Sequence, residues 1–227
     1  MGRRTIITID GPAGAGKSTA AKGLAQALGY LYLDSGALYR AVAWEALRCR
    51  VEVQDPIALA AFLEDFKPLI ALDETGLHLF IDGREVSREL RTPEVSQEAS
   101  RVAAAPQVRI WVTACLRNLA ANREVVAEGR DLGSVVFPDA AVKFFMTADL
   151  TTRAARRRQE WQSDDVAVNL EKTVTELATR DRQDETRTES PLMAPEGAIR
   201  IDTTALTPEE VVNICLAEIR AALAWHG

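Results

Sequence analysis

The chain has 227 residues, a formal net charge of −6, 47% apolar residues and 26% charged residues. This composition is ordinary for a globular domain and argues against disorder, and no apolar run reaches the ~18 residues that a membrane-spanning helix needs. The acidic balance argues against a nucleic-acid-binding protein, and the apolar run from Thr5 to Ile9 is too short for a signal peptide. We therefore expect a cytoplasmic protein with no membrane or nucleic-acid partner.

The first part of the chain alternates between predicted strands and helices. Runs rich in β-branched and apolar residues indicate strands at residues 4–10 and 30–33. Apolar residues at helical spacing indicate helices at 17–29 and 36–50. Such alternation is typical of a mostly parallel sheet covered on both faces, so we expect an α/β fold.

A short antiparallel insert interrupts this pattern. Apolar runs at 69–72 and 77–81 are joined by a polar turn that ends in Gly76, which predicts a hairpin. The dipeptide Asp82-Gly83 predicts a second tight turn directly afterwards. We expect a small β insert within the α/β fold.

The α/β pattern resumes in the second half of the chain. An apolar face at helical spacing predicts a helix at 107–122, and Thr207 begins a last amphipathic helix. Three further strands are expected, at 124–128, 141–146 and 198–201. Together with the two earlier strands they would form a five-stranded sheet.

The strongest motif is a glycine-rich loop between the first predicted strand and the first predicted helix. It matches the Walker A pattern G-x-x-x-x-G-K-[ST] in full and runs Gly11-Pro12-Ala13-Gly14-Ala15-Gly16-Lys17-Ser18, followed by Thr19. Backbone N–H groups of such a loop surround phosphate oxygens, and the helix N-terminus adds partial positive charge. We expect Lys17 to contact the β- and γ-phosphates of ATP and Ser18 to ligate Mg²⁺. A glycine-rich turn that matches by chance is the alternative.

Two further motifs follow predicted strands and carry arginines. The run from Asp34 to Arg40 places its arginine one turn into a helix, and the run from Glu128 to Gly133 contains the pair Arg130-Asp131. Strand ends near a phosphate loop open onto the ligand crevice of an α/β sheet, which makes these arginines candidates for gripping a second phosphate. Each motif alone also fits a plainer interpretation, namely a solvated Arg40 and a local ion pair in a turn.

Arginines are unusually frequent and cluster in the C-terminal third. The chain has 22 arginines and 5 lysines, which suits phosphate binding because arginine offers two parallel hydrogen bonds, although codon usage can produce the same excess. Arg153, Arg156 and Arg157 share one helical face, and Arg158 follows them. Like charges on one face repel, so the cluster indicates a bound polyanion. A solvated basic face is the alternative.

A second polar set lies on the next predicted helical segment. Arg180, Asp184 and Arg187 are spaced i, i+4 and i+7. With the arginine-bearing segment before them, and a polar tip at 159–168 between the two, they predict a helical hairpin. Closing such a hairpin over ATP would exclude water and stabilise charge on the transferring phosphoryl group, which is how a mobile lid acts.

The order of these motifs resembles that of the bacterial cytidylate kinases, over essentially the whole chain. The resemblance is carried by the phosphate loop, the run from Leu33 to Arg40, the run from Gly129 to Ala140, the arginine-rich lid and the final Ile201-Asp202-Thr203-Thr204. It implies a P-loop NTPase core with a five-stranded, mostly parallel sheet flanked by helices, together with a small antiparallel β insert and a helical lid.

The resemblance also implies an organisation and an activity. One kinase chain, 1–227, would comprise three regions: a core at about 1–35, 107–150 and 170–227, a monophosphate-binding region at about 36–106, and a lid at about 151–169. The implied reaction transfers the γ-phosphoryl group of ATP, with Mg²⁺, to CMP or dCMP. A monomer is the family's expected state.

Residue roles follow from the resemblance position by position. Positions that contact the cytosine ring are matched by Ser100, Arg109 and Asp131, and positions that hold the acceptor's α-phosphate by Arg40 and Arg130. Sugar-contacting positions are matched by Arg180 and Asp184, a phosphate-facing arginine by Arg187, and a nearby pocket position by Ser35. The ATP-binding residues would be the loop from Gly11 to Thr19 with Arg153 and Arg157.

Catalysis would rest on positioning and cationic stabilisation, because the acceptor is already an anionic oxygen and needs no strong base. The residues assigned to it are Lys17, Arg130, Arg157 and Arg187. The nearest alternative is a P-loop kinase for another acceptor, such as UMP, dTMP or shikimate, although Asp131 with Arg109 favours cytosine. A GTPase-type switch lacks its Asn-Lys-x-Asp motif here, and a nonenzymatic scaffold would not need the intact Lys17, Ser18 and arginine set.

Overall fold

The computed structural model describes residues 5–162, 170–187 and 189–224. The chain divides into two compact units: unit 1 contains Tyr30–Val125, and unit 2 combines Thr5–Gly29 with Val126–Gly227. The three regions expected from the sequence divide the chain at other positions and stay a prediction. Within the described ranges, no helix is both long enough and apolar enough to cross a membrane.

A five-stranded sheet has the strand order β2-β6-β1-β7-β8. Its strands are β1 (Ile6–Asp10), β2 (Leu31–Asp34), β6 (Val125–Gly129), β7 (Val142–Thr147) and β8 (Ile199–Asp202). Strand β7 pairs in parallel with β1 and with β8, in a register that sets Asp10 opposite Phe145. The predicted five-stranded α/β sheet is confirmed.

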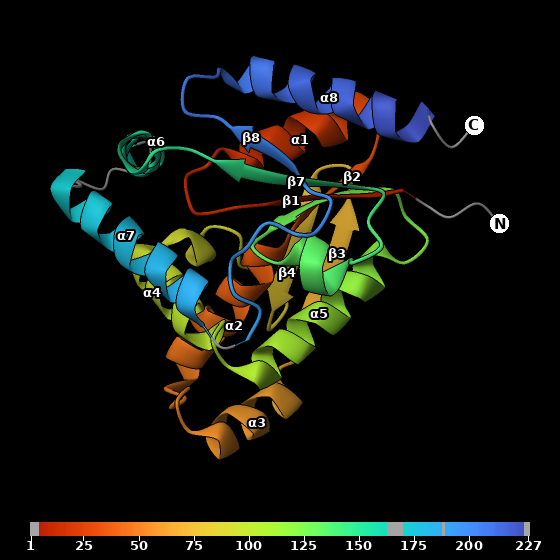
Figure 1. The fold of residues 1–227 in the computed structure, drawn as a ribbon. Coiled ribbons are helices and arrows are strands. Elements are labelled where there is room, and N and C mark those ends of the chain that lie inside the picture. The colour runs from red at the N-terminus through yellow and green to blue at the C-terminus, as the bar shows by residue number, and fades with distance from the viewer. Residues whose placement is uncertain (1–4, 163–169, 188, 225–227) are drawn as a thin grey trace. The chain divides into compact units, whose positions relative to one another are not determined.

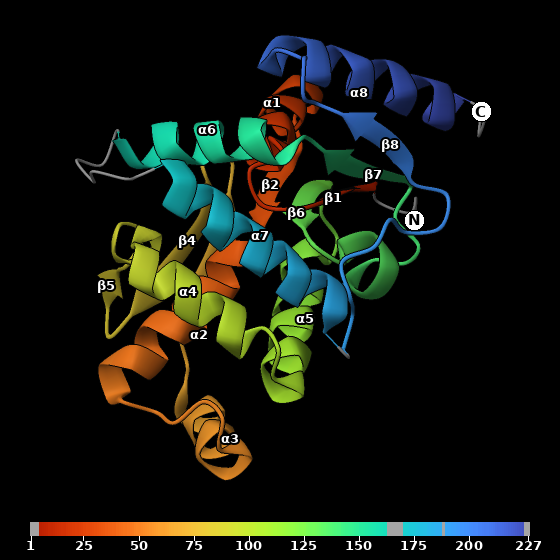
Figure 2. The same ribbon diagram turned by 60° about the vertical axis from the view of Figure 1, so that its left-hand side comes forward.

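Two pairs of helices accompany the strands of unit 2. Helices α1 (Lys17–Leu28) and α8 (Pro208–Ala224) lie side by side (Figure 1). Helices α6 (Leu150–Gln162) and α7 (Leu170–Thr186) are also neighbours and form the two arms of the predicted hairpin (Figures 1 and 2). Most of the predicted lid tip, residues 163–168, lies outside the described residues.

The core of unit 2 is built from its central strands. Strands β1, β6 and β7 are buried along almost their whole length, as expected for parallel strands covered on both faces. Large side chains that are completely or almost completely buried come from both strands and helices: Ile7, Ile9, Phe144, Met146, Leu24 and Ile219. This core holds the end of β1, and with it the phosphate loop, in a fixed place.

Unit 1 combines helices with the predicted β insert. Its three-stranded antiparallel sheet has the order β3 (Leu69–Asp73), β4 (Gly76–Ile81) and β5 (Arg84–Glu85). Helix α2 packs against α4, as both ribbon views show (Figure 2). The helices are α2 (Ser35–Cys49), α3 (Pro56–Asp65), α4 (Pro93–Val102) and α5 (Pro106–Ala120), with a 3₁₀ turn, η1, at Glu89–Arg91. The insert and α5 are confirmed, whereas α3 and α4 were not predicted.

Candidate active site

The glycine-rich loop connects β1 to α1 in unit 2, as predicted. Gly11 has φ +145°, and a Cβ at this position would lie 2.0 Å from the carbonyl oxygen of Met146, so only glycine fits. Gly16 precedes α1 without a side-chain cap, and the helix begins at Lys17. The first N–H groups of a helix lack intrahelical partners and carry partial positive charge, so this end of α1 is suited to phosphate oxygens.

Lys17 is the buried cation of the loop. Lys17 is only 5% exposed, and its Nζ donates to the carbonyl oxygen of Pro12 at 2.7 Å. Burial lowers the pKa of Lys17 to about 7, with the charge of Arg130 acting in the same direction and Glu128 and Asp10 opposing it. An adjacent phosphate anion would favour the charged ammonium, so the environment of Lys17 matches an anionic ligand.

The turn after β6 carries a second group of charges in unit 2. Arg130 donates from Nε to Oδ2 of Asp184 on α7 at 3.1 Å, and Arg187 Nη1 lies 3.7 Å from Oδ1 of the same carboxylate. Arg187 Nη2 lies 3.9 Å from Oδ1 of Asp131. Two arginines and two carboxylates thus form one network with balanced charge. The hydrogen bond to Asp184 fixes the plane of the Arg130 guanidinium, which suits bidentate phosphate binding, and the two longer contacts keep Arg187 beside the carboxylates.

Arg180 brings a third cation towards Lys17. The charges of Arg130 and Arg180 both lower the pKa of Lys17, which places the three cations within electrostatic reach of one another. Gathering like charges in a buried place is unfavourable unless anions join them. The carboxylates of Glu128 and Asp10 offset only part of this repulsion. The arrangement therefore suits a polyphosphate.

Two arginines of α6 donate hydrogen bonds to other residues of the protein. Arg153 Nε donates to the carbonyl oxygen of Ala148 at 3.0 Å, and its Nη1 donates both to Ala13 O at 3.2 Å and to Asp181 Oδ2 at 2.6 Å. Arg156 donates from Nη1 and Nη2 to the side-chain and backbone oxygens of Thr203, at 3.0 and 2.7 Å. These bonds connect α6 to the phosphate loop and to the residue after β8.

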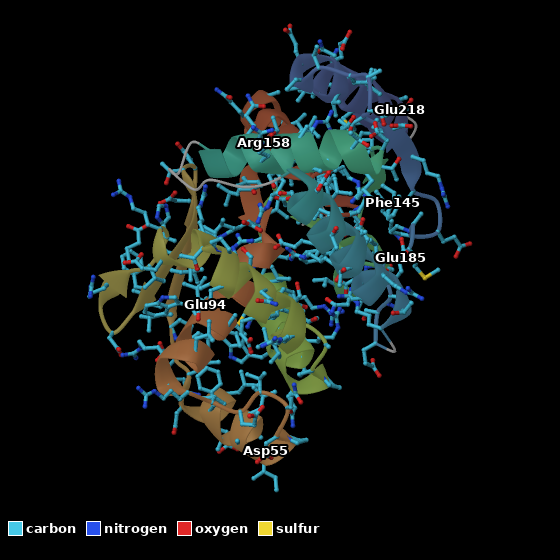
Figure 3. The ribbon with its side chains drawn as sticks, turned by 90° about the vertical axis from the view of Figure 1, so that its left-hand side faces the viewer. Asp55, Glu94, Phe145, Arg158, Glu185 and Glu218 are labelled. Carbon is cyan, nitrogen blue, oxygen red and sulfur yellow. The ribbon has the colours of Figure 1, made fainter. Side chains whose placement is uncertain are left out.

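The predicted arginine face is therefore only partly directed outwards. Arg157 is half-buried and Arg158, labelled in Figure 3, is exposed. A solvated basic face is wrong for Arg153, which is 7% exposed. Binding of ATP by Arg153 and Arg157 stays a prediction. Sequence reasoning missed Asp181 and Thr203, because each meets its arginine only through the fold.

In unit 1, Arg40 is held by a carboxylate at the start of its own helix. Arg40 Nη2 donates to Asp34 Oδ2 at 2.7 Å, and Asp34 also accepts from the backbone N–H of Ala37, capping α2. Burial alone raises the pKa of Asp34, but Arg40 and the backbone donors outweigh it, so the pKa lies below its ordinary value. Asp34 was part of the recognised motif, but sequence reasoning gave it no role; the structure shows that it orients Arg40.

The base-reading residues predicted in unit 1 lie on α4 and α5. Arg109 is 7% exposed, donates from Nη1 to Ala103 O at 3.2 Å, and has its guanidinium carbon 6.0 Å from the ring centroid of Tyr39 on α2. Ser100 Oγ donates to Ser96 O within α4 at 3.4 Å. Arg109 thus lies next to the helix that carries Arg40. Ser35 is buried at the first position of α2.

The loop also fits the expected metal ion. Ser18 is exposed at the start of α1 and offers a hydroxyl oxygen, the kind of ligand that Mg²⁺ prefers. Across the part of the chain that the structure describes, no group of three or more His, Cys, Asp or Glu side chains could hold a metal ion by itself. Such a site suits a Mg²⁺ that is bound through nucleotide phosphates, water and one or two protein oxygens.

A family model and curated relatives were found to match this chain, and they are described as cytidylate kinases. The family model described as Cytidylate kinase matches residues 7–221. The cytidylate kinase of Caldanaerobacter subterraneus subsp. tengcongensis is 46% identical to this chain, over 94% of this chain and 94% of the relative. The cytidylate kinase of Geobacter sp. (strain M21) is 41% identical, over 96% of this chain and 94% of the relative.

Two further comparisons agree. A bifunctional pantoate ligase/cytidylate kinase of Synechococcus elongatus is 44% identical over 94% of this chain and 41% of its own length. The crystal structure of a gluconokinase from Sinorhizobium meliloti 1021 matches with a TM-score of 0.50 at 16% identity, over 99% of this chain and 98% of that one, a likeness of fold alone. The chain belongs to the cytidylate kinase family.

Proposed function

We propose that this chain transfers the γ-phosphoryl group of ATP to the 5′-phosphate of CMP or dCMP, giving ADP and the corresponding diphosphate. The observation that carries the proposal is the gathering of Lys17, Arg130 and Arg180 at the phosphate loop of unit 2, next to the Arg–Asp network. Membership of the cytidylate kinase family supports the acceptor. Another acceptor, such as UMP, dTMP or a non-nucleotide, is not favoured.

On the donor side, the loop from Gly11 to Thr19 holds the phosphates of ATP. Lys17 contacts the β- and γ-phosphates, and Ser18 ligates Mg²⁺, which neutralises phosphate charge when bound. Arg157, on the lid arm α6, supplies further positive charge. Arg153 donates from Nε and Nη1 to Ala148, Ala13 and Asp181, so it also holds the loop and the lid arms together, and we assign it to ATP binding with Arg157.

On the acceptor side, two phosphate-binding arginines are each oriented by a carboxylate. Arg40 is held by Asp34 in unit 1, and Arg130 is held by Asp184 in unit 2. We assign both to the α-phosphate of CMP. Residues assigned to the cytosine ring are Ser100, Arg109 and Asp131; those assigned to the sugar are Arg180 and Asp184; Ser35 is assigned to CMP as well.

The reaction needs no general base. A phosphate oxygen of CMP, already ionised near neutral pH, attacks the γ-phosphorus while the bond between that phosphorus and the β–γ bridging oxygen breaks, and ADP leaves with the electron pair. Lys17, Arg130 and Arg187 stabilise the charge that moves between these oxygens. Removing Arg187 would cost on the order of 10³-fold in turnover. If Arg187→Ala kept near-normal turnover, Arg187 would have no such role.

The test is a coupled assay of ADP release with MgATP and each of six monophosphates: CMP, dCMP, UMP, AMP, GMP and dTMP. Turnover confined to CMP and dCMP would support the acceptor and the base-reading residues. Preference for another monophosphate would leave the fold and the phosphate loop unaffected but overturn the specificity. Absence of turnover with all six would point to a non-nucleotide acceptor.

We further infer a cytoplasmic monomer. The support for the location is that the described chain has no helix suited to crossing a membrane and that its relatives are nucleotide kinases. Size-exclusion chromatography with light scattering tests the monomer, and fractionation of the source cells tests the location. A stable dimer, or recovery in the membrane fraction, would contradict this part of the proposal.

A further inference from the structure

Strand β1 ends in a carboxylate for which the proposed reaction has no use. Asp10, the residue before the phosphate loop, is fully buried. Its Oδ1 accepts the backbone N–H of Leu132 and its Oδ2 accepts that of Gly133, both at 2.8 Å. One side chain thus joins the start of the phosphate loop to the turn that directly follows Arg130 and Asp131.

The turn held by Asp10 is wider than an α-helical turn, because the N–H of Phe137 donates to the carbonyl oxygen of Leu132, five residues earlier. Residues Leu132–Val136 form a single π-helical turn, η2, whose first N–H groups have no partner within the turn. Asp10 supplies the acceptors that a capping side chain would otherwise provide. A Cβ on Gly133 would lie 2.9 Å from Thr8 Oγ1 and 2.9 Å from Pro195 Cγ, so the turn packs against Thr8 of β1 with no room for a side chain at this position.

We infer that Asp10 is a positioning residue for phosphoryl transfer, which fixes Arg130 and Asp131 relative to the phosphate loop by holding the two N–H groups that follow them. This inference rests on the proposed function, in which Arg130 and Asp131 bind the acceptor. Phosphoryl transfer depends mainly on positioning, and a displacement of about 1 Å can cost on the order of 10²-fold in rate. A carboxylate shared between the two loops provides that precision.

The ionisation state of Asp10 matters for this role. Burial raises its pKa to about 6, and Asp131 adds to the increase, while the Gly133 and Leu132 N–H groups and the charge of Lys17 oppose it. The ionised carboxylate accepts with both oxygens, whereas protonation makes one oxygen a donor that faces an N–H group. The hold on η2 should therefore weaken as pH falls through about 6.

The experiment compares Asp10→Asn with Asp202→Asn in steady-state kinetics. The asparagine keeps the size of the side chain but replaces one acceptor oxygen with a donor, so one N–H of η2 loses its partner. Asp202 is a matched control, because it also ends a parallel strand and accepts a backbone N–H, that of Thr204, but is exposed. Cooperative thermal unfolding of each variant verifies that it is folded.

For Asp10→Asn we expect the KM for CMP to rise about tenfold or more, with kcat reduced and the KM for ATP changed less than about twofold. Asp202→Asn should leave all three unchanged. The ratio of wild-type to Asp10→Asn kcat/KM for CMP should fall towards one as pH decreases from 7.5 to 5.5. Taking this ratio cancels the ionisation of CMP itself, whose second phosphate pKa is also about 6.

Two results would overturn the inference. Unchanged kcat and KM values in a variant that merely unfolds at a lower temperature would mean that Asp10 only supports the fold, and an equal rise in both KM values would mean that it acts on the phosphate loop rather than on η2. If Asp10→Asn does not fold, the wild-type protein decides by NMR: the amides of Leu132 and Gly133 should titrate together near pH 6. Invariant amides would contradict the inference. Because this titration needs no substrate, it separates a failure of the inference from a failure of the proposed function.

Discussion

Unit 2 and the region around the β insert of unit 1 contain ion pairs of nearly equal length in very different surroundings. Arg153 and Asp181 lie 2.6 Å apart with side chains 9% and 13% exposed. Arg48 and Asp82 lie 2.7 Å apart with side chains 47% and 69% exposed. The Arg48–Asp82 pair stays hydrated, so water screens its attraction and little desolvation free energy is lost when it forms. The Arg153–Asp181 pair interacts at low dielectric, but both of its charges had to lose their water first.

The difference shows where in the chain charged groups are buried despite the unfavourable free energy of desolvation. Burying an ion pair is rarely the most stable solution, so buried pairs are informative about position rather than about stability. In unit 2, Arg153 of one pair also donates to Ala13 of the phosphate loop, and Arg130 of another, bonded to Asp184, acts on the pKa of Lys17. Around the β insert, comparable charges lie in solvent and orient nothing that the proposed reaction uses.

The two lysines of α1 provide the largest expected contrast. Lys17 is buried and Lys22, one and a half turns later, is exposed. Lys17→Met should reduce turnover by about 10³-fold or more, because the transition state loses a buried cation at the transferring phosphoryl group. Lys22→Met should change turnover less than about twofold. The coupled ADP-release assay measures both, and comparable activities in the two variants would refute the role of Lys17.

Stability should separate the two arginine pairs. Arg153→Ala leaves Asp181 buried without its cation, and breaking a buried pair in this way costs about 3–5 kcal/mol. Asp82→Asn should leave the urea midpoint nearly unchanged, since water replaces the lost charge and Arg48 keeps its ion pair with Glu45. Urea unfolding of both variants measures the difference.

A double variant sharpens this second contrast. Removing Asp181 as well as Arg153 should restore part of the lost stability, because no charge is then left buried alone. Simple additivity of the two single losses would show that Arg153 and Asp181 do not act as a pair.

The raised pKa of Asp10 predicts a distinctive pH dependence of the free energy of unfolding. Its pKa is about 6 in the folded protein and 3.8 in the unfolded chain, so between these values the folded state binds a proton that the unfolded state has released. Stability therefore falls as pH rises from about 4 to about 6, by at most about 3 kcal/mol from this group. Urea unfolding at a series of pH values should show a smaller decline for Asp10→Asn. Parallel curves for the two proteins would mean that Asp10 ionises normally.

Local sequence patterns predicted the regular elements and the loop that they position. The five strands, the β insert and the helices α1, α2, α5 and α8 all follow from periodicity and from the Walker A pattern. Helices α3 and α4 were missed although each has a local signal: Asp55-Pro56 and Thr92-Pro93 are N-cap residues followed by proline, and both caps are formed. In α4 the apolar residues Val95, Ala99 and Val102 also have helical spacing, so both signals were overlooked there.

The partners of the predicted site residues could not be obtained in this way. Asp10 lies 122 residues from Leu132, and Arg153 lies 140 residues from Ala13. No spacing rule connects such positions, because they meet only when the parallel strands align. Family resemblance assigned a ligand to Arg130 and Arg187 but gave no account of what holds them. The structure supplies that account through carboxylates that the motifs contain but do not explain.

The smallest expected effect on stability is that of replacing His78, which belongs to an exposed cluster of charges. Its Nδ1 lies 3.2 Å from Glu85 Oε1 and its Nε2 lies 3.2 Å from Asp73 Oδ1, both exposed carboxylates. Glu85 is the largest cause of its raised pKa, so any added stability is present below the ordinary value of 6.5 and is lost as pH rises through the folded pKa. Because solvent screens this cluster, His78→Gln should lower the melting temperature only slightly, only at acid pH, and not at all in high salt. A loss comparable to that of Arg153→Ala, or one that persists in salt, would show that exposure does not decide what these charges contribute.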